Sequence, residues 1–190
     1  QNEQEMLVTF KGVVKKLNQI YWTVDSEKEH ATQVGSYGRL TAINGTSDLD
    51  MLFILPDNLF KQYDDYENNG QSALLQDVKL ALLEKYPDSD IIADGQVVKF
   101  NHSSYIIEIV PCFLLADGTF KHADTNDGGS WVITDPKAEM KAIDTLDATT
   151  GGILRVLCKM LRAWKNKNGV PIGGFLIDTL VFNFLSEKTQ

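Results

Sequence analysis

The chain has 190 residues, a net charge of −8 and a pI near 4.8. Hydrophobic residues make up 43% of it and charged residues 23%, a balance that allows a buried core and a solvated surface. We expect no strong binding to nucleic acid, because the phosphate backbone repels an acidic protein. Since no stretch of about 18 residues is strongly apolar, we also expect no membrane-spanning helix.

The predicted elements follow from hydrophobic periodicity and turn residues. The dipeptide Asp94-Gly95 predicts a hairpin. In chain order we expect a helix over 6–30, a helical stub within 34–44, a strand over 49–55, a helix over 71–86, strands over 90–93, 96–101 and 105–110, a mixed segment over 111–134, and helices over 151–167 and 173–187. This order predicts an α+β domain over residues 1–148, followed by the beginning of a helical domain over residues 149–190.

Cellular location and metal binding can be judged from the chain's ends, its cysteines and its histidines. The acidic start, Gln1 to Glu5, lacks the basic-then-apolar order of a secretion signal. Cys112 and Cys158 lie far apart in apolar surroundings, which argues against a disulfide framework and predicts a cytoplasmic protein. We assign no role to the histidines, which show no metal-ligand spacing: His30, His102 and His122.

A pair of carboxylates stands at the start of the first predicted strand. Asp48 and Asp50 flank Leu49, and on a strand such positions share one face with Cα atoms roughly 6–7 Å apart. Two ionised carboxylates this close repel each other, and a divalent cation removes that repulsion. Magnesium prefers such hard oxygen ligands, so the pair is a candidate metal site. Taken alone, Asp-x-Asp is also common at solvated strand ends and helix caps.

Gly35-Ser36 supplies the second part of the motif. A glycine turn before a helix start directs backbone N–H groups, here with the Ser36 hydroxyl, toward an anion. A phosphate chain with its magnesium is the ligand that fits both parts. Gly-Ser alone is only a turn, and the specific signal is its combination with Ser47-Asp48-Leu49-Asp50 and an apolar strand.

The segment Gly35 to Asp50 reads Gly-Ser-Tyr-Gly-Arg-Leu-Thr-Ala-Ile-Asn-Gly-Thr-Ser-Asp-Leu-Asp. It resembles the CD-NTase family, bacterial relatives of cyclic GMP-AMP synthase and oligoadenylate synthase in the DNA polymerase β-like nucleotidyltransferase superfamily. The resemblance implies a palm with a mixed sheet flanked by helices, plus the start of an oligoadenylate synthase-like helical second lobe. It implies two Mg²⁺ ions, with Mn²⁺ as an alternative, and attack by a sugar hydroxyl on an α-phosphate with loss of pyrophosphate. It further implies nucleotide contacts by Gly35, Ser36, Arg39 and Ser47.

Two-metal chemistry needs a third acid, since two ions roughly 3.5–4 Å apart are shared between the attacking and leaving oxygens. Glu108 is a lone charge in an apolar run, which is unfavourable unless the charge is paired or binds metal. Its same-face neighbours Ile106 and Val110 are apolar, which favours function over simple solvent exposure. The string Glu-Ile-Val-Pro resembles the family segment that carries the third metal ligand, with glutamate as a modest departure.

Residues 153–167 form a basic helix, and no acid occurs between Ala148 and Ile177. Arg155, Lys159 and Arg162 follow at +4 and +3 spacing, which predicts one shared face that suits a triphosphate. For any one of these residues a solvated face is an equally good interpretation. The resemblance singles out Lys159 as the lysine that holds the triphosphate tail. The packing side is predicted to consist of Ile153, Leu154, Leu157, Leu161 and Trp164.

Pro171 to Asp178 resembles a second-domain segment of the family, in which a serine commonly contacts phosphate and an aromatic residue stacks on the base. Gly174 stands at the serine position, and Phe175 stands at the aromatic position, with a core role as its alternative. A stretch near Trp131 resembles an element beside the active site. There we expect Trp131 to be buried rather than to contact a ligand.

The resemblance implies an enzyme that joins nucleoside triphosphates into cyclic or short linear oligonucleotides as a bacterial signal against phage. A regulatory protein of the same defence system is a further expected partner. One alternative transfers the nucleotide to an antibiotic, a tRNA end or a protein, and another is a nucleotide-binding module without turnover. The resemblance covers residues 30–185, and family members usually continue further, so we expect the second lobe to be incomplete.

Overall fold

The computed structural model describes residues 2–43, 45 and 48–188. Its contacts divide the chain into two compact units, each described by itself below. Unit 1 comprises residues 1–33 and 48–135, and unit 2 comprises residues 34–47 and 136–190. This division differs from the predicted boundary at residue 148, because segment 34–47 and residues 136–148 pack in unit 2. The assignment of a catalytic core and a second lobe stays a prediction. No helix in the described ranges is long and apolar enough to cross a membrane.

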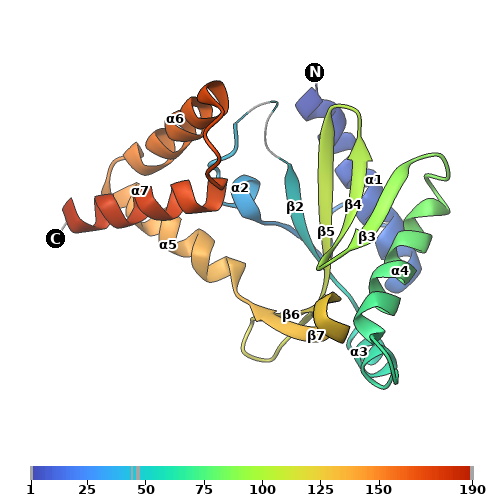
Figure 1. The fold of residues 1–190 in the computed structure, drawn as a ribbon. Coiled ribbons are helices and arrows are strands. Elements are labelled where there is room, and N and C mark those ends of the chain that lie inside the picture. The colour runs from blue at the N-terminus through green and yellow to red at the C-terminus, as the bar shows by residue number, and fades with distance from the viewer. Residues whose placement is uncertain (1, 44, 46–47, 189–190) are drawn as a thin grey trace. The chain divides into compact units, whose positions relative to one another are not determined.

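Unit 1 is built on a seven-stranded mixed sheet (Figure 1). The main path runs β1-β2-β5-β4-β3, while β6 pairs with β5 and β7 pairs with β6. β2 and β5 are parallel, and the other pairs are antiparallel. The strands are β1 (Ala31–Gln33), β2 (Leu49–Ile54), β3 (Asp90–Asp94), β4 (Val97–His102), β5 (Tyr105–Leu114), β6 (Phe120–Asp124) and β7 (Ser130–Thr134).

One face of this sheet packs against helices. α1 (Asn2–Tyr21) contacts β5, and α4 (Gly70–Leu83) contacts β3 and β4 as well as α1. Apolar side chains at alternate strand positions fill this layer, as the period of a half-buried strand requires. The remaining helical elements of the unit are α3 (Asp57–Asp64) and a short 3₁₀ helix (Asn126–Gly128). Fully buried side chains of the strands include Leu49, Met51, Phe53, Ile107 and Ile109.

Most predicted elements of unit 1 are confirmed, including the Asp94-Gly95 hairpin between β3 and β4. The first helix is shorter than predicted, because it ends at Tyr21 and not at residue 30. Asn18 accounts for this end: its carbonyl accepts N–H bonds from Trp22 and Val24, and its side-chain amide donates to the carbonyls of Ser26 and Glu29. The chain is thereby drawn out of the helical path.

Two predictions near the centre of the chain were wrong. The strand predicted over 105–110 continues through Pro111 to Leu114, because its last residues pair with β6. The mixed segment predicted over 111–134 therefore contains β6, β7 and the end of β5. The prediction also omitted α3 and α5, although Pro136 at the first position of α5 is a helix-start signal.

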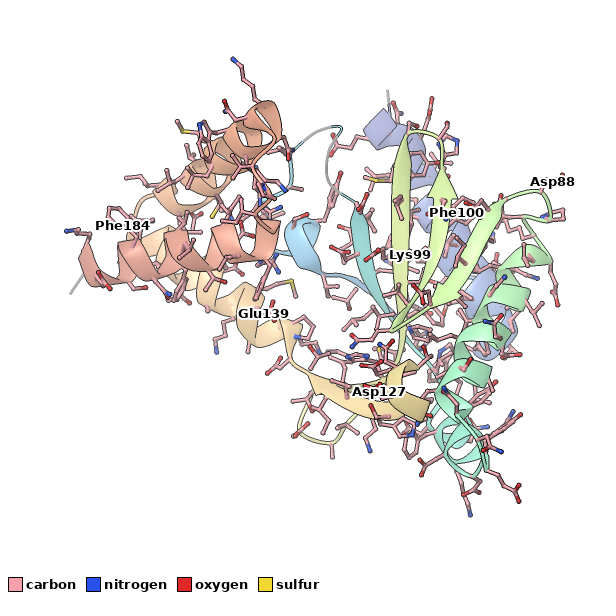
Figure 2. All side chains as sticks on the ribbon, in the orientation of Figure 1. Asp88, Lys99, Phe100, Asp127, Glu139 and Phe184 are labelled. Carbon is pink, nitrogen blue, oxygen red and sulfur yellow. The ribbon has the colours of Figure 1, made fainter. Side chains whose placement is uncertain are left out.

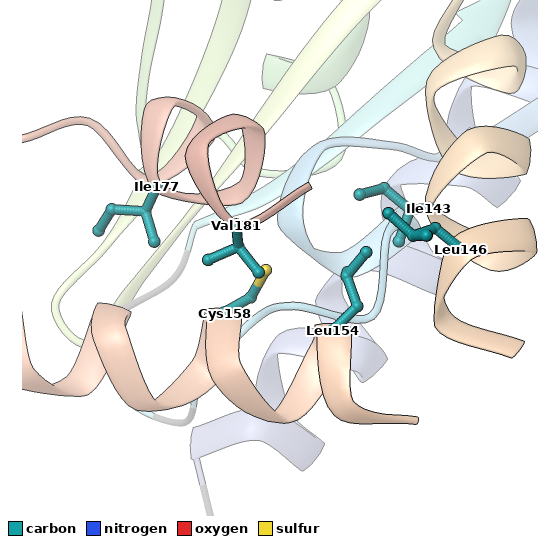
Figure 3. Packing of buried hydrophobic residues seen from close by; sticks show 6 residues of the cluster. All are labelled: Ile143, Leu146, Leu154, Cys158, Ile177 and Val181. Carbon is teal, nitrogen blue, oxygen red and sulfur yellow. The ribbon is translucent and has the colours of Figure 1, made fainter. Parts of the chain in front are cut away.

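Unit 2 consists of α2 (Gly35–Gly38), α5 (Pro136–Thr149), α6 (Ile153–Asn168) and α7 (Gly174–Lys188) with their connections. The predicted stub and the two predicted C-terminal helices are thus confirmed. An apolar cluster joins α5, α6 and α7 (Figure 3). Its members are Ile143, Leu146, Leu154, Cys158, Ile177 and Val181.

A buried ionic network stabilises the same unit. Asp178 is 1% exposed and accepts bidentate bonds from Arg162, with Nε to Oδ1 at 2.9 Å and Nη2 to Oδ2 at 2.7 Å. Its Oδ2 also accepts bonds from Arg39 Nε at 3.1 Å and from the Thr41 hydroxyl at 2.8 Å. Burial alone would raise the pKa of Asp178, but hydrogen bonds from Arg162 and Thr41 and both arginine charges hold it below the usual range.

Replacing Asp178 by alanine should lower the free energy of unfolding by about 3–5 kcal/mol, because the buried Arg162 loses the carboxylate that it binds and the buried Arg39 keeps only Glu139. The network should also make the fold acid-sensitive. Since the folded pKa is lowered, the stability that Asp178 contributes is present above its unfolded pKa of about 3.9 and is lost as the pH falls through the folded value. Urea unfolding followed by circular dichroism, at neutral and acidic pH, measures both effects.

Asp144→Ala is the matched control for this variant. The Asp144 side chain is 62% exposed and pairs with Arg155 at the surface of unit 2. Its removal should change the unfolding free energy by only about 0–1 kcal/mol. Equal losses in the two variants would contradict the role given to the buried network.

Gly174→Ala should destabilise unit 2 by about 1–3 kcal/mol through overpacking. A Cβ atom at position 174 would lie 2.5 Å from Arg162 Nη1 and 2.8 Å from its Cζ, and that guanidinium is fixed by Asp178. Gly173→Ala is the control, since nothing lies within 4 Å of a Cβ there. Thermal unfolding that ranks the two variants equally would contradict the prediction. The same contact explains why glycine suits the position at which the family commonly has serine.

Candidate active site

Three charged residues lie in a row across neighbouring strands of unit 1. Asp50 on β2 is the register partner of Glu108 on β5, and Glu108 is the register partner of Lys99 on β4. Register partners on adjacent strands project from the same face of a sheet. Asp50, Glu108 and Lys99 therefore form what we call the charged row. The structure thus brings together two of the three predicted metal ligands.

Strand alternation explains why this row faces away from the core. On β2, Leu49 and Met51 are fully buried while Asp50 between them is partly exposed. Glu108 is flanked in the same way by the buried Ile107 and Ile109 on β5. On β4, Lys99 and its neighbour Phe100 belong to opposite faces (Figure 2). A slip by one residue would bury the charges, so the pattern fixes the register.

Asp48 joins this cluster through its electrostatics. It lies immediately before β2 and is exposed. Partial desolvation and the charge of Glu108 raise the pKa of Asp48, while the Lys99 charge opposes the rise. The negative charge of Glu108 therefore disfavours ionisation of Asp48, as expected of acids gathered at one site.

The donor set suits a hard divalent cation. Asp48, Asp50 and Glu108 would supply carboxylate oxygens, and a cation would relieve the repulsion that raises the pKa of Asp48. In this structure, however, Lys99 Nζ lies 3.0 Å from Glu108 Oε1. Among the described residues, no three His, Cys, Asp or Glu side chains are gathered closely enough to form a ready metal cluster. Asp50 and Glu108 are thus register partners in the fold, with Glu108 paired to a lysine.

The remaining predicted site residues belong to unit 2, except that Ser47 lies outside the described residues. Gly35 has φ +59°, a left-handed conformation that favours glycine, and it begins α2. Ser36 is buried, and its carbonyl accepts N–H bonds from Thr41 and Ala42. These contacts make the Gly-Ser turn compact, and its predicted nucleotide contact stays a prediction.

Arg39 has a structural role that the sequence did not indicate. Its guanidinium is bonded to Asp178 and, at 3.3 Å, to Glu139 of α5. The residue is 5% exposed. These bonds tie the end of α2 to α5 and α7, and the contact of Arg39 with nucleotide stays a prediction.

The prediction that Arg155, Lys159 and Arg162 form one basic face was wrong. Arg162 is buried against Asp178, and Arg155 donates to Asp147, Asp144 and the carbonyl of Arg39. Both arginines bind acids of the neighbouring helices α5 and α7, while Lys159 is exposed. The packing side also differs: Ile153 and Trp164 are exposed, while Leu154 and Cys158 are buried.

Phe175 is not a core residue, because 56% of it is exposed. Its ring lies over Arg39, with the centroid 5.0 Å from Cζ. A cavity of about 140 Å³ opens beside it within unit 2. The cavity is lined by Arg39, Glu139, Ala142, Ile143, Phe175, Asp178, Thr179 and Phe182.

Trp131 has structural contacts in unit 1 and is partly buried, close to what was expected. Its Nε1 donates to Asp64 Oδ1 at 2.9 Å, and its ring packs at 5.0 Å from Phe60 and 5.8 Å from Phe113. Lys99 is the charged residue at the site that the sequence analysis missed. A lone lysine between Val98 and Phe100 in an apolar strand was the available signal.

Comparison with known proteins identifies the family. Residues 1–146 match the model of the Second Messenger Oligonucleotide or Dinucleotide Synthetase domain. No curated protein sequence matches the chain.

Solved structures with this fold are similar at low sequence identity. CdnE cyclic dinucleotide synthase of Elizabethkingia meningoseptica, solved with GTP and Apcpp, has TM-score 0.69 and 16% identity over 93% of this chain and 67% of its own. The E. coli MS115-1 CdnC:HORMA-deltaN complex gives TM-score 0.66 and 14% identity over 97% and 58%. Apo DncV of Vibrio cholerae gives 0.61 and 16% over 82% and 45%. The chain therefore spans about half to two thirds of each of these structures.

The mixed sheet flanked by helices confirms the predicted α+β, polymerase β-like fold. The family match covers more than half of the chain and agrees with the Gly-Ser and Asp-x-Asp motifs. The chain belongs to the CD-NTase family of nucleotidyltransferases, the synthetases of oligonucleotide and dinucleotide second messengers.

Proposed function

We propose that this protein joins nucleoside triphosphates into cyclic or short linear oligonucleotides and releases pyrophosphate. The observation that carries the proposal is the pairing of Asp50 with Glu108 across two parallel strands, with Asp48 coupled to the same cluster. The family supports the reaction class. Nucleoside triphosphates are the proposed substrates, in keeping with the GTP and Apcpp named for the CdnE structure.

Asp48, Asp50 and Glu108 would hold the divalent cations, Mg²⁺ or Mn²⁺. When bound, these ions neutralise the developing charge on the phosphates and favour ionisation of the attacking hydroxyl. The protein's own contribution is rigidity, because β2 and β5 are buried on the opposite face and fix the carboxylates before substrate arrives. A bond forms between a sugar hydroxyl oxygen and the α-phosphorus, the bond to pyrophosphate breaks, and the hydroxyl proton leaves to a carboxylate oxygen of the cluster.

Unit 2 would supply the contacts to the nucleotide. Lys159 carries an exposed ammonium group suited to the triphosphate, and Phe175 presents an exposed ring suited to stacking on a base. Gly35 and Ser36, together with Ser47, complete the proposed phosphate contacts. Within this unit Arg39 contacts the Phe175 ring and the Asp178 carboxylate. These contacts hold the end of α2 beside the ring that we propose stacks on a base.

Partners and setting are part of the same proposal. A cytoplasmic role in defence against phage accords with two buried cysteines and with the family. A regulatory protein is a further proposed partner, in keeping with the complex that CdnC, another protein, forms with HORMA-deltaN.

Asp50→Asn and Glu108→Gln should each lower product formation at least about a hundredfold, because each removes a charged cation ligand with little change of shape. Purified protein is incubated with the four ribonucleoside triphosphates and Mg²⁺, and products are separated by chromatography and mass. The wild type should yield phosphatase-resistant oligonucleotides. Asp88→Asn, in an exposed turn (Figure 2), is the control and should retain activity. An Asp50→Asn variant as active as the wild type would refute the site.

Lys159→Met should weaken binding of a non-hydrolysable triphosphate about tenfold, since one charge-assisted contact to phosphate is lost. Lys167→Met on the same helix is the matched control, because it also removes one exposed ammonium group. Binding is measured by calorimetric titration in the presence of Mg²⁺. Equal losses in both variants would point to general electrostatic attraction and against a specific contact by Lys159.

A further inference from the structure

Lys99 is the member of the charged row that has no part in the reaction described so far. We propose that Lys99 is a positioning residue that pairs with Glu108 in the cation-free protein and must give up that carboxylate when a divalent cation binds, so that it sets the cation affinity of the site. The inference rests on the proposed function, because it takes the three carboxylates as the cation ligands.

The geometry places Lys99 where it competes directly with a cation. β4 pairs with β5 over residues 98–102, and register sets Lys99 opposite Glu108. Lys99 Nζ approaches Glu108 Oε1 to 3.0 Å, within hydrogen-bonding distance. A cation that uses Glu108 as a ligand must therefore replace this ammonium group at the carboxylate.

The charges of the row support the same conclusion. Lys99 is the positive group beside Glu108, and Glu108 is in turn the register partner of Asp50. The lysine charge thus partly neutralises the two paired carboxylates, which is the task that a bound cation would take over.

Partial exposure makes this pair exchangeable. The Lys99 and Glu108 side chains are 37% and 26% exposed, so water can solvate either group once the pair opens. The lysine charge also repels a divalent ion held by the same carboxylates. The pairing of Lys99 with Glu108 and the repulsion by the lysine charge both weaken cation binding, and removal of the ammonium group should strengthen it about tenfold. A lysine with a merely structural role would alter folding stability without this gain.

The test is titration of the nucleotide-free protein with Mn²⁺, with free ion followed by electron paramagnetic resonance. Lys99→Met, which keeps the chain length and removes the charge, should bind Mn²⁺ about tenfold more tightly than the wild type. Lys99→Arg should restore wild-type affinity. Lys11→Met, on the exposed side of α1, makes the same change in net charge and should leave the affinity unchanged. Circular dichroism verifies that each variant is folded.

The outcomes separate this inference from the proposed function. Loss of Mn²⁺ binding in Asp50→Asn, with Lys99→Met unchanged or weaker than the wild type, would overturn the role of Lys99 and leave the cation site intact. An equal gain in Lys99→Met and Lys11→Met would assign the effect to net charge and would also overturn it. Absence of binding in the wild type and in Lys99→Met, or equal binding in Asp50→Asn, would remove the cation site on which both proposals depend.

Discussion

The parallel pairing of β2 with β5 is the constraint on which the candidate site depends. It sets Asp50 beside Glu108, two acids that repel each other unless a positive group lies between or beside them. The strands tolerate this because Leu49, Met51, Ile107 and Ile109 are fully buried on the opposite face and fix the register. The apolar burial that stabilises the sheet therefore also maintains an electrostatically unfavourable arrangement, which a functional site commonly requires.

The protein pairs acidic side chains with positive charge in two different ways. In unit 2, Asp178 is buried between Arg39 and Arg162 with its oxygens occupied by hydrogen bonds, and loss of a partner there would leave uncompensated buried charge. In unit 1, Lys99 and Glu108 are partly exposed, and pairs of this kind contribute about 0–1 kcal/mol. The first arrangement is suited to hold a structure together. The second is weak enough to be exchanged for a ligand, which is why the same type of contact supports different roles in the two units.

The sequence was most informative where a local period decides the structure. Apolar runs predicted the strands that carry Asp50 and Glu108, because a strand depends on residues close in the chain. The sequence was least informative where one element packs against another. The helical period placed Arg155 and Arg162 beside Lys159, but Arg162 turned toward Asp178 and Arg155 toward Asp147. Lys99 stood out locally as a lone lysine in an apolar strand, but its partner Glu108 follows only from the pairing of β4 with β5.

The residues of the family motif have different structural roles. Gly35 provides a left-handed backbone that begins α2, whereas Arg39, four residues later, is buried and bonded to Asp178 and Glu139. The Arg39 guanidinium also lies against Phe175, so a motif residue near the start of the chain orders an aromatic ring near its end. Within unit 2 the Gly-Ser turn is thereby linked to the helix that carries Phe175. A motif of this length can thus describe a binding turn and the ionic network that holds the turn in place, and only the contacts distinguish the two.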